Sequence, residues 1–252
     1  MQFHPVILCN FKPAMTGALG RWFHGPFTPA VPSCGMRTRT PFLLLLGLAL
    51  AGAGALWFLA RSNSSTRASL RIDPTGAVVY TLGAPDAPLE VWVGSDYQCP
   101  DCRRYEIDEL PAIAERFVAT GKVRWRYLLF ALPGHAEAGP ATHAMACAID
   151  QGDRSAAAMH EGLFAAQAEW SRSPDHLAVF RRVAEAGGLD LTAYDECMAS
   201  NRHADQVAGS WREAQRVGIP GTPTVVLFER FYVGGLTANQ LERLLNRPPD
   251  QR

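Results

Sequence analysis

The sequence predicts an α/β fold interrupted by an all-helical insertion. Two strand-like runs between residues 77 and 93 lead into a helix that begins at a Cys-x-x-Cys motif, and another strand follows that helix. Helical patterns alone occupy residues 135–217, after which the chain returns to strands at 224–233 and ends in a helix. Strand, helix and strand in succession predict a parallel βαβ unit, and the closing strands predict a hairpin on the same sheet.

Composition limits both the size of the fold and the class of partner. With 252 residues, 48% of them apolar, the chain can bury the core of one medium-sized domain. The formal net charge is zero, so we expect protein partners and no nucleic acid. The six cysteines are Cys9, Cys34, Cys99, Cys102, Cys147 and Cys197. Only one pair has the Cys-x-x-Cys spacing, so a four-thiolate zinc site is incomplete and no metal is expected.

The N-terminal part differs in character from the rest. Residues 1–35 show no sustained period of 2 or 3.6, which predicts an irregular extension. Met36 then begins Met-Arg-Thr-Arg-Thr, two positive charges just before an uncharged apolar run over residues 42–60. This is the pattern of a secretory signal or signal anchor. We therefore expect translation to start at Met36, with residues 1–35 upstream of the true start.

The apolar run is long enough to remain in a membrane. Its 19 residues would span roughly 28 Å as a helix, close to the ~30 Å hydrocarbon core, so residues 36–61 are predicted to form a single transmembrane anchor. A cleaved signal is the alternative, because residues 51–55 contain small residues suited to a cleavage site. The run continues through Leu56–Leu59, which favours the anchor. In either case we expect the rest of the chain on the extracytoplasmic, periplasmic side, joined by a Ser-rich linker over residues 62–73.

The globular domain is predicted over residues 74–247. Its first half should contain strands at 77–82, 89–93 and 122–130, with a helix from Pro100 to Leu110 that Pro111 kinks or restarts before Gly121. The helical insertion over 135–217 should contain helices at 135–150, 155–168, 174–186, 191–198 and 204–217.

The last part of the domain is predicted to return to the sheet. Strands at 224–228 and 231–233 should form a hairpin with its turn at Glu229–Arg230. A final helix should begin at Thr237, whose spacing to Gln240 fits a capping box.

Cys99 and Cys102 are the residues that predict chemistry. They stand at a strand-to-helix junction, where unpaired backbone N–H groups and the helix dipole stabilise a thiolate. We expect Cys99 to be the exposed nucleophile with a lowered pKa and Cys102, one turn inward, to resolve the mixed disulfide. Half of a zinc site and a purely structural disulfide are the alternatives. The predicted chemistry needs no cofactor beyond this redox-active disulfide.

Five short motifs carry a family resemblance. They are Gly83–Pro88, Ser95–Cys102, Leu132–His135, Cys147–Gly152 and Gly218–Thr224. In this order they resemble the DsbA-like thioredoxin family, in particular its membrane-anchored branch, over about two-thirds of the chain. The resemblance implies a thioredoxin fold with a helical insertion and a thiol:disulfide oxidoreductase that acts on exported proteins in extended form.

The resemblance also implies a direction and a redox partner. It favours a disulfide-forming oxidase that a membrane quinone-linked thiol oxidase of the DsbB type reoxidises. A reductase or isomerase of extracytoplasmic disulfides is the close rival, and a non-catalytic chaperone or binding module of the same fold is a third reading. No separate dimerisation domain is visible in the sequence, so we expect a monomer.

The family pattern assigns roles to four further residues. Thr222 and Pro223 resemble the cis-proline loop that faces the active-site disulfide, where the Thr222 backbone would pair with a substrate strand. An ordinary trans turn proline is the alternative. Cys147 and Cys197 match positions at which many relatives have cysteines, and we expect a structural disulfide rather than two buried free thiols.

Two positions depart from the family pattern. Asp101 stands where His, Tyr or Ser is often found; with Pro100 it should modulate the thiol chemistry, because a carboxylate near the thiolate disfavours the charged form. Val93 replaces a buried glutamate, so proton transfer to Cys102 must use water or another group. Asp96 is read as a loop acid near the site or as a turn residue.

Two histidines are predicted near the site. His135 and His160 either border a substrate groove or are capped or satisfied within the core, and the second reading is favoured.

Overall fold

The computed structural model describes residues 70–248 and residue 251. The N-terminal extension, the anchor and residues 62–69 of the linker that the sequence predicts lie outside the described residues. The described residues belong to one compact unit. Among them, no helix combines the length and the apolar character that a membrane crossing requires.

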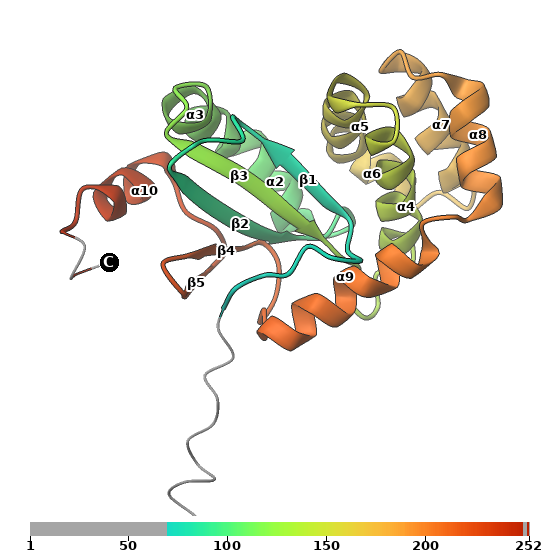
Figure 1. The fold of residues 1–252 in the computed structure, drawn as a ribbon. Helices are drawn as coiled ribbons and strands as arrows, with labels where there is room; N and C mark the ends of the chain where they lie inside the picture. The colour runs from blue at the N-terminus through green and yellow to red at the C-terminus, as the bar shows by residue number, and fades with distance from the viewer. Residues whose placement is uncertain (1–69, 249–250, 252) are drawn as a thin grey trace, which may run out of the picture. The chain divides into compact units, whose positions relative to one another are not determined.

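One mixed five-stranded sheet forms the centre of the described part (Figure 1). Its strands are β1 (Val79–Leu82), β2 (Leu89–Ser95), β3 (Val123–Leu129), β4 (Thr224–Leu227) and β5 (Arg230–Val233). The spatial order is β1-β3-β2-β4-β5. Strands β2 and β3 are parallel and the other neighbouring pairs are antiparallel. The predicted βαβ unit and closing hairpin are therefore confirmed.

Helices make up most of the connection between β2 and β3. It contains α2 (Pro100–Asp108), α3 (Leu110–Ile113) and a π-helical turn, η1 (Ala114–Val118). Pro111 lies in the first turn of α3, where a missing backbone N–H costs nothing, so the helix restarts there as predicted.

The remaining helices lie before and after the hairpin that β4 and β5 form. They are α4 (Ala138–Ile149), α5 (Asp153–Ala165), α6 (Gln167–Trp170), α7 (His176–Ala186), α8 (Leu191–Ser200), α9 (Ala204–Val217) and α10 (Ala238–Leu245). The first six fall between β3 and β4, where the sequence predicts only helices. Helix α10 begins with the predicted capping box between Thr237 and Gln240.

Successive side chains of β2 point to opposite faces of the sheet, and each face has its own layer of the core. Val91 and Val93 pack into the larger core, which also contains Cys102 of α2. Trp92 points to the opposite face and packs in a second cluster with Val217 of α9. Successive residues of a strand face opposite sides of a sheet, so α2 and α9 cover different faces.

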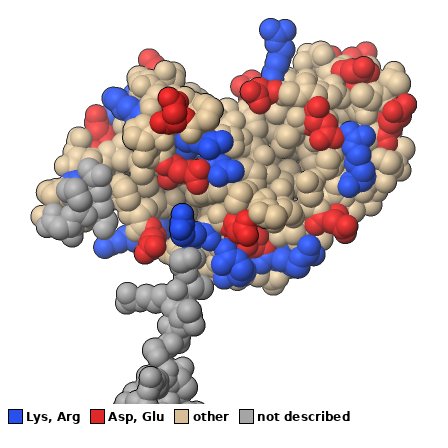
Figure 2. Space-filling model, in the orientation of Figure 1, with Lys and Arg blue, Asp and Glu red and all other residues tan. Residues whose placement is uncertain are grey.

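The helices of the insertion gather beside the sheet, and α9 returns from them towards it (Figure 1). On the face drawn in Figure 2, basic and acidic side chains are interspersed over both the sheet part and the helical part. This distribution agrees with the zero net charge of the sequence.

The predicted position of the hairpin turn is wrong by one residue. The structure has Phe228 and Glu229 in the turn, with φ of 51° and 54°, and Arg230 already belongs to β5. Two consecutive left-handed residues match the right-handed twist of the two strands. Neither position is the glycine or asparagine that usually marks such a turn.

Candidate active site: a dithiol beside a cis-proline loop

The end of β2 and the start of α2 place both cysteines. Cys99 is the N-cap residue of α2 with an extended backbone, and Pro100 is the first helical residue, whose fixed φ suits a helix start. Cys102 lies one turn further and is fully buried. The two thiols are free in this structure. The unpaired N–H groups of the first turn are therefore available to the sulfur of Cys99.

The loop before β4 reaches the same point from the other direction. Strand β4 runs antiparallel to β2 with Thr224 opposite Gly94, so the chain before β4 meets the chain after β2. The Thr222–Pro223 peptide bond in this loop is cis, the geometry that the family resemblance implies. The Cys99 thiol lies 3.5 Å from the Thr222 carbonyl oxygen and donates to it.

The environment of Cys99 lowers the pKa of its thiol from the ordinary value of 9.0 to about 6. The largest cause is a hydrogen bond from the Cys102 thiol, which stabilises the Cys99 thiolate. Partial burial acts in the opposite direction, while the Thr222 side chain and the backbone N–H groups of Cys102 and Asp101 lower the pKa further. The lowered pKa that the sequence predicts is thus explained mainly by the partner thiol and the helix N-terminus.

The Cys102 thiol behaves in the opposite way. Burial is the largest cause that raises its pKa well above the ordinary value, and the charge of a neighbouring Cys99 thiolate raises it further. The backbone N–H of Asp96 contacts the Cys102 sulfur at 3.5 Å. One thiolate and one protonated thiol are the form that this pair favours, which suits attack by Cys99 and resolution by Cys102.

Cys99 is more enclosed than the sequence predicted. The expectation was an exposed nucleophile, whereas only 6% of its surface is accessible. The Thr222 carbonyl covers the sulfur, and the buried Gln167 of α6 donates hydrogen bonds to the backbone oxygens of Tyr97 and Cys99 at 2.7 and 2.8 Å. Sequence reasoning missed Gln167, because only the fold brings the insertion against the active-site loop.

Asp101 lies at the surface rather than against the thiolate. Its carboxylate is exposed and forms an ion pair with Arg104 at 2.7 Å. Asp101 lowers the pKa of Cys99 through a hydrogen bond from its backbone N–H. Arg103, which the sequence placed beside the motif, instead donates from Nε to the Phe164 carbonyl in α5.

Asp96 is a buried acid beside the motif and also a turn residue. Its carboxylate accepts hydrogen bonds from the backbone N–H groups of Gln98 and Leu132 at 2.7 Å each. His135 Nδ1 lies 2.8 Å from the same carboxylate. The sequence left the two readings of Asp96 open, and the structure shows both; His135 is fixed by this contact.

A buried polar network lies next to the dithiol helix. Glu106, one turn after Cys102 on α2, accepts from the Tyr127 hydroxyl at 3.0 Å and faces His160 Nε2 at 3.3 Å. His160 Nδ1 pairs with the Tyr97 hydroxyl at 2.8 Å. His160 is therefore satisfied within the core, as the favoured reading of the sequence has it.

Glu106 was missed by sequence reasoning, which looked for a carboxylate in the strand, at Val93, and in the loop, at Asp96, but not in the helix after the motif. The spacing Cys102 to Glu106 places both on one helix face and could have indicated it. Its second carboxylate oxygen, Oε1, is buried and has no hydrogen-bond partner within the described ranges.

Cys147 of α4 and Cys197 of α8 are joined by a disulfide in the structure. Their Cα atoms are 5.8 Å apart, and 50 residues separate them in sequence. The pairing agrees with the one that the resemblance implies, and it links two helices of the insertion.

The chain is similar to known proteins. A family model described as thioredoxin matches residues 76–247. The probable disulfide bond formation protein D of Bacillus anthracis is 25% identical over 168 residues, 63% of this chain and 71% of the relative. The Na(+)/H(+) antiporter NhaA 3 of Salinispora tropica is 34% identical over 158 residues, 62% of this chain. The chain spans only 22% of the length of that antiporter.

Solved structures agree on the fold. The crystal structure of oxidised BdbD from Bacillus subtilis superposes with a TM-score of 0.61 at 21% identity, over 69% of this chain and 94% of that one. A low-pKa dithiol at a helix N-terminus beside a cis-proline loop defines a thiol–disulfide oxidoreductase. The chain belongs to the thioredoxin family, and the resemblance to DsbA-like oxidoreductases is confirmed.

Proposed function

We propose that the protein forms disulfides in exported polypeptides, with Cys99 and Cys102 as its redox-active pair. The observation that supports this direction is the Cys99 pKa of about 6. A stabilised thiolate favours the reduced form of the pair, and a stable reduced form makes the disulfide a stronger oxidant. The family relation to a disulfide bond formation protein supports the same direction.

The reaction begins when a substrate thiolate attacks Cys99 in the Cys99–Cys102 disulfide. The bond between the two enzyme sulfurs breaks, and Cys102 leaves and takes up a proton, for which its raised pKa suits it. A second substrate thiolate then attacks the substrate sulfur of the mixed disulfide and releases Cys99 as a thiolate. A leaving group with a low pKa departs readily, so this step also benefits from the Cys99 environment.

The cis-proline loop would hold the substrate. The Thr222 carbonyl lies beside Cys99, and backbone groups at such a loop pair with an extended peptide as an added strand. Cys99 is largely covered by this loop, which favours extended chains that can enter it over folded surfaces. Pro100 starts the helix, and Asp101 supplies a backbone N–H to the thiolate.

The cellular setting follows from the sequence rather than from the described residues. We place the catalytic domain on the extracytoplasmic side, tethered by residues 36–61, with a membrane quinone-linked thiol oxidase as the reoxidising partner. The pair of cysteines acts without a further cofactor. Such a setting allows the Cys147–Cys197 disulfide to form, and this disulfide links two helices of the insertion.

The equilibrium between the full-length protein and glutathione tests the direction. An oxidase is expected to have a potential near that of strong oxidants, about −120 mV, and a value near about −270 mV would show a reductase instead. Oxidation of a peptide with two thiols should require both cysteines and stop in Cys99→Ser. A Cys99→Ser protein that retained full activity would exclude this site altogether.

A further inference from the structure

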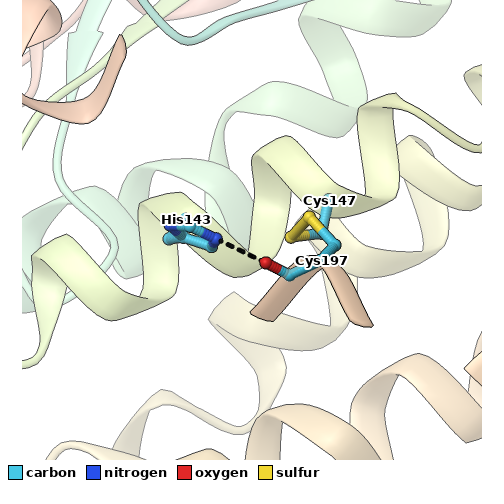
Figure 3. A group of neighbouring side chains, drawn as sticks. All are labelled: His143, Cys147 and Cys197. Atoms are coloured by element: carbon cyan, nitrogen blue, oxygen red, sulfur yellow. Dashed lines mark hydrogen bonds between the residues drawn. A yellow bond between two sulfur atoms is a disulfide. The ribbon is translucent and has the colours of Figure 1, made fainter. Parts of the chain in front are cut away.

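A second group of ligand-type side chains surrounds the sulfur of Cys197, away from the redox pair. His143 and Cys147 lie one helical turn apart on α4, and Cys197 faces them from α8 (Figure 3). A ring nitrogen of His143 and the two sulfurs all lie within 4.8 Å of one another. The Cys197 sulfur also lies within 4.8 Å of a ring nitrogen of His203 and a carboxylate oxygen of Asp150.

A structural disulfide gives no reason for two histidines beside it. His143 is buried, and its Nε2 lies 3.3 Å from the carbonyl oxygen of Cys197. Its ring meets the His203 ring edge-on with the centroids 5.8 Å apart. His143 and Cys147 of α4 and His203 at the N-terminus of α9 thus lie on different sides of the Cys197 sulfur, and together they offer the donor types of a tetrahedral metal site.

We propose that reduction of the Cys147–Cys197 disulfide opens a zinc site whose ligands are His143, Cys147, Cys197 and His203. A dithiol supplies the two electrons: its own sulfurs become a disulfide, and Cys147 and Cys197 become thiols. Zinc then binds both sulfurs and displaces their two protons. Two thiolates and two imidazoles are a donor set that selects Zn²⁺ in tetrahedral geometry.

Asp150 orients one of these ligands. Its carboxylate lies 2.8 Å from His203 Nε2 and is also bound by the guanidinium of Arg202. The other ring nitrogen, Nδ1, lies 2.5 Å from Gln206 Oε1, and zinc would replace this contact. A carboxylate that accepts from a ligand histidine fixes the ring orientation and increases the basicity of the ligand. Arg202 neutralises the negative charge of Asp150. The negative charge that attracts the zinc ion therefore comes from the two thiolates.

A cavity gives the ion a route to the cluster. It has a volume of about 740 Å³, and His143 is part of its wall together with Tyr194, Met198 and Asn201. The cavity lies among the helices that also carry the two cysteines. An entry path of this kind is one of the requirements for a metal site that fills after folding.

The site would couple metal binding to redox state. With the disulfide closed, the sulfurs are not available as ligands and zinc is excluded. With zinc bound, both thiolates are engaged and protected from oxidation. The helices α4 and α8 of the insertion are therefore cross-linked in both states, by a disulfide in one and by a metal ion in the other.

Cobalt binding to the full-length chain tests the proposal. Cys9→Ser, Cys34→Ser, Cys99→Ser and Cys102→Ser are combined, so that Cys147 and Cys197 are the remaining cysteines. The protein is titrated with Co²⁺ before and after reduction by a phosphine. We expect one Co²⁺ per chain after reduction, with tetrahedral visible bands and a thiolate-to-cobalt charge-transfer band that Zn²⁺ abolishes, and no binding before reduction.

Single histidine variants separate the four-ligand site from binding by thiols alone. His143→Ala and His203→Ala should each weaken Co²⁺ binding by about tenfold or more. His176→Ala is the control, because His176 lies on α7, pairs with Glu137 and is not one of the proposed ligands, so this variant should leave the affinity unchanged. The proposal is overturned if the reduced protein that keeps only Cys147 and Cys197 shows no charge-transfer band, whether it is folded or unfolded. It is also overturned if His143→Ala or His203→Ala leaves the Co²⁺ affinity unchanged.

Discussion

The thiolate of Cys99 depends on one neighbour more than on any other. The Cys102 thiol is the largest cause of the lowered Cys99 pKa, ahead of the Thr222 side chain and the backbone N–H groups. The two cysteines therefore act together: Cys102 keeps its own proton and donates it in a hydrogen bond to the Cys99 thiolate. This dependence can be measured by varying pH.

Alkylation of Cys99 should follow a titration near pH 6. Above about pH 6 the thiolate dominates, and at pH 7 roughly nine-tenths of the thiol is ionised. A folded-state pKa below the unfolded value stabilises the reduced fold at high pH, and this stabilisation is lost as pH falls through about 6. Iodoacetamide rates against pH measure the pKa, and in Cys102→Ala the midpoint should rise. A midpoint that stays near 6 in this variant would show that the helix N-terminus alone suffices.

The hydroxyl of Thr222 is buried, and in the described part of the chain it has no hydrogen-bond partner in the thiol form. The Thr222 side chain lowers the pKa of Cys99, because its hydroxyl donates a hydrogen bond to the thiolate. Thr222→Val keeps the shape and removes the donor. The Cys99 pKa should rise and the disulfide should become less oxidising in a glutathione equilibrium. Thr192→Val, on the distant helix α8, is the control and should change neither quantity.

At the scale of elements, α6 couples the insertion to the active-site loop. The short helix α6 contributes the side chain of Gln167, which bonds two backbone oxygens on either side of Gln98. Gln167→Ala leaves these buried oxygens unpaired and should reduce the free energy of unfolding by about 1–3 kcal/mol. Denaturant unfolding of this variant and of Gln215→Ala, an exposed glutamine of α9, provides the comparison. Equal losses in the two variants would contradict the role of Gln167.

Most elements of this fold could be predicted because their signals are local. Alternating apolar residues marked the strands, Pro100 and Pro111 marked helix starts, and Thr237 with Gln240 marked a cap. The hairpin turn was misplaced because Phe228 and Glu229 adopt left-handed conformations without the usual turn residues.

The parts of the site that depend on tertiary contact could not be predicted. Cys99 and Cys102 were found from their spacing and from the strand-to-helix junction. The enclosure of Cys99, by contrast, comes from Thr222 and from Gln167, which are far from it in sequence. Glu106 and His160 meet only because α5 packs on α2, and no period in the sequence encodes that contact.

For the whole molecule, the Cys147–Cys197 disulfide closes a loop of helices. A cross-link of this length restricts the unfolded chain, so Cys147→Ser with Cys197→Ser should lower the free energy of unfolding by about 2–4 kcal/mol. The Cys99 pKa should stay near 6, because none of its causes lies in the insertion's disulfide. Denaturant unfolding and the alkylation profile measure the two quantities on one protein. A shift of the Cys99 pKa in the double variant would reveal coupling between the two sulfur pairs.

The cis-proline loop also has a fixed length. Helix α9 ends at Gly218, which adopts a left-handed conformation with φ of 80°, and the register of β4 against β2 begins at Thr224 opposite Gly94. Both ends of the segment 219–223 are therefore anchored, and a Cβ on Gly94 would press against Ile219 within it at 3.1 Å. Homologous genes should accordingly tolerate substitutions in this segment far better than insertions or deletions, since one added residue would move Thr222 away from Cys99.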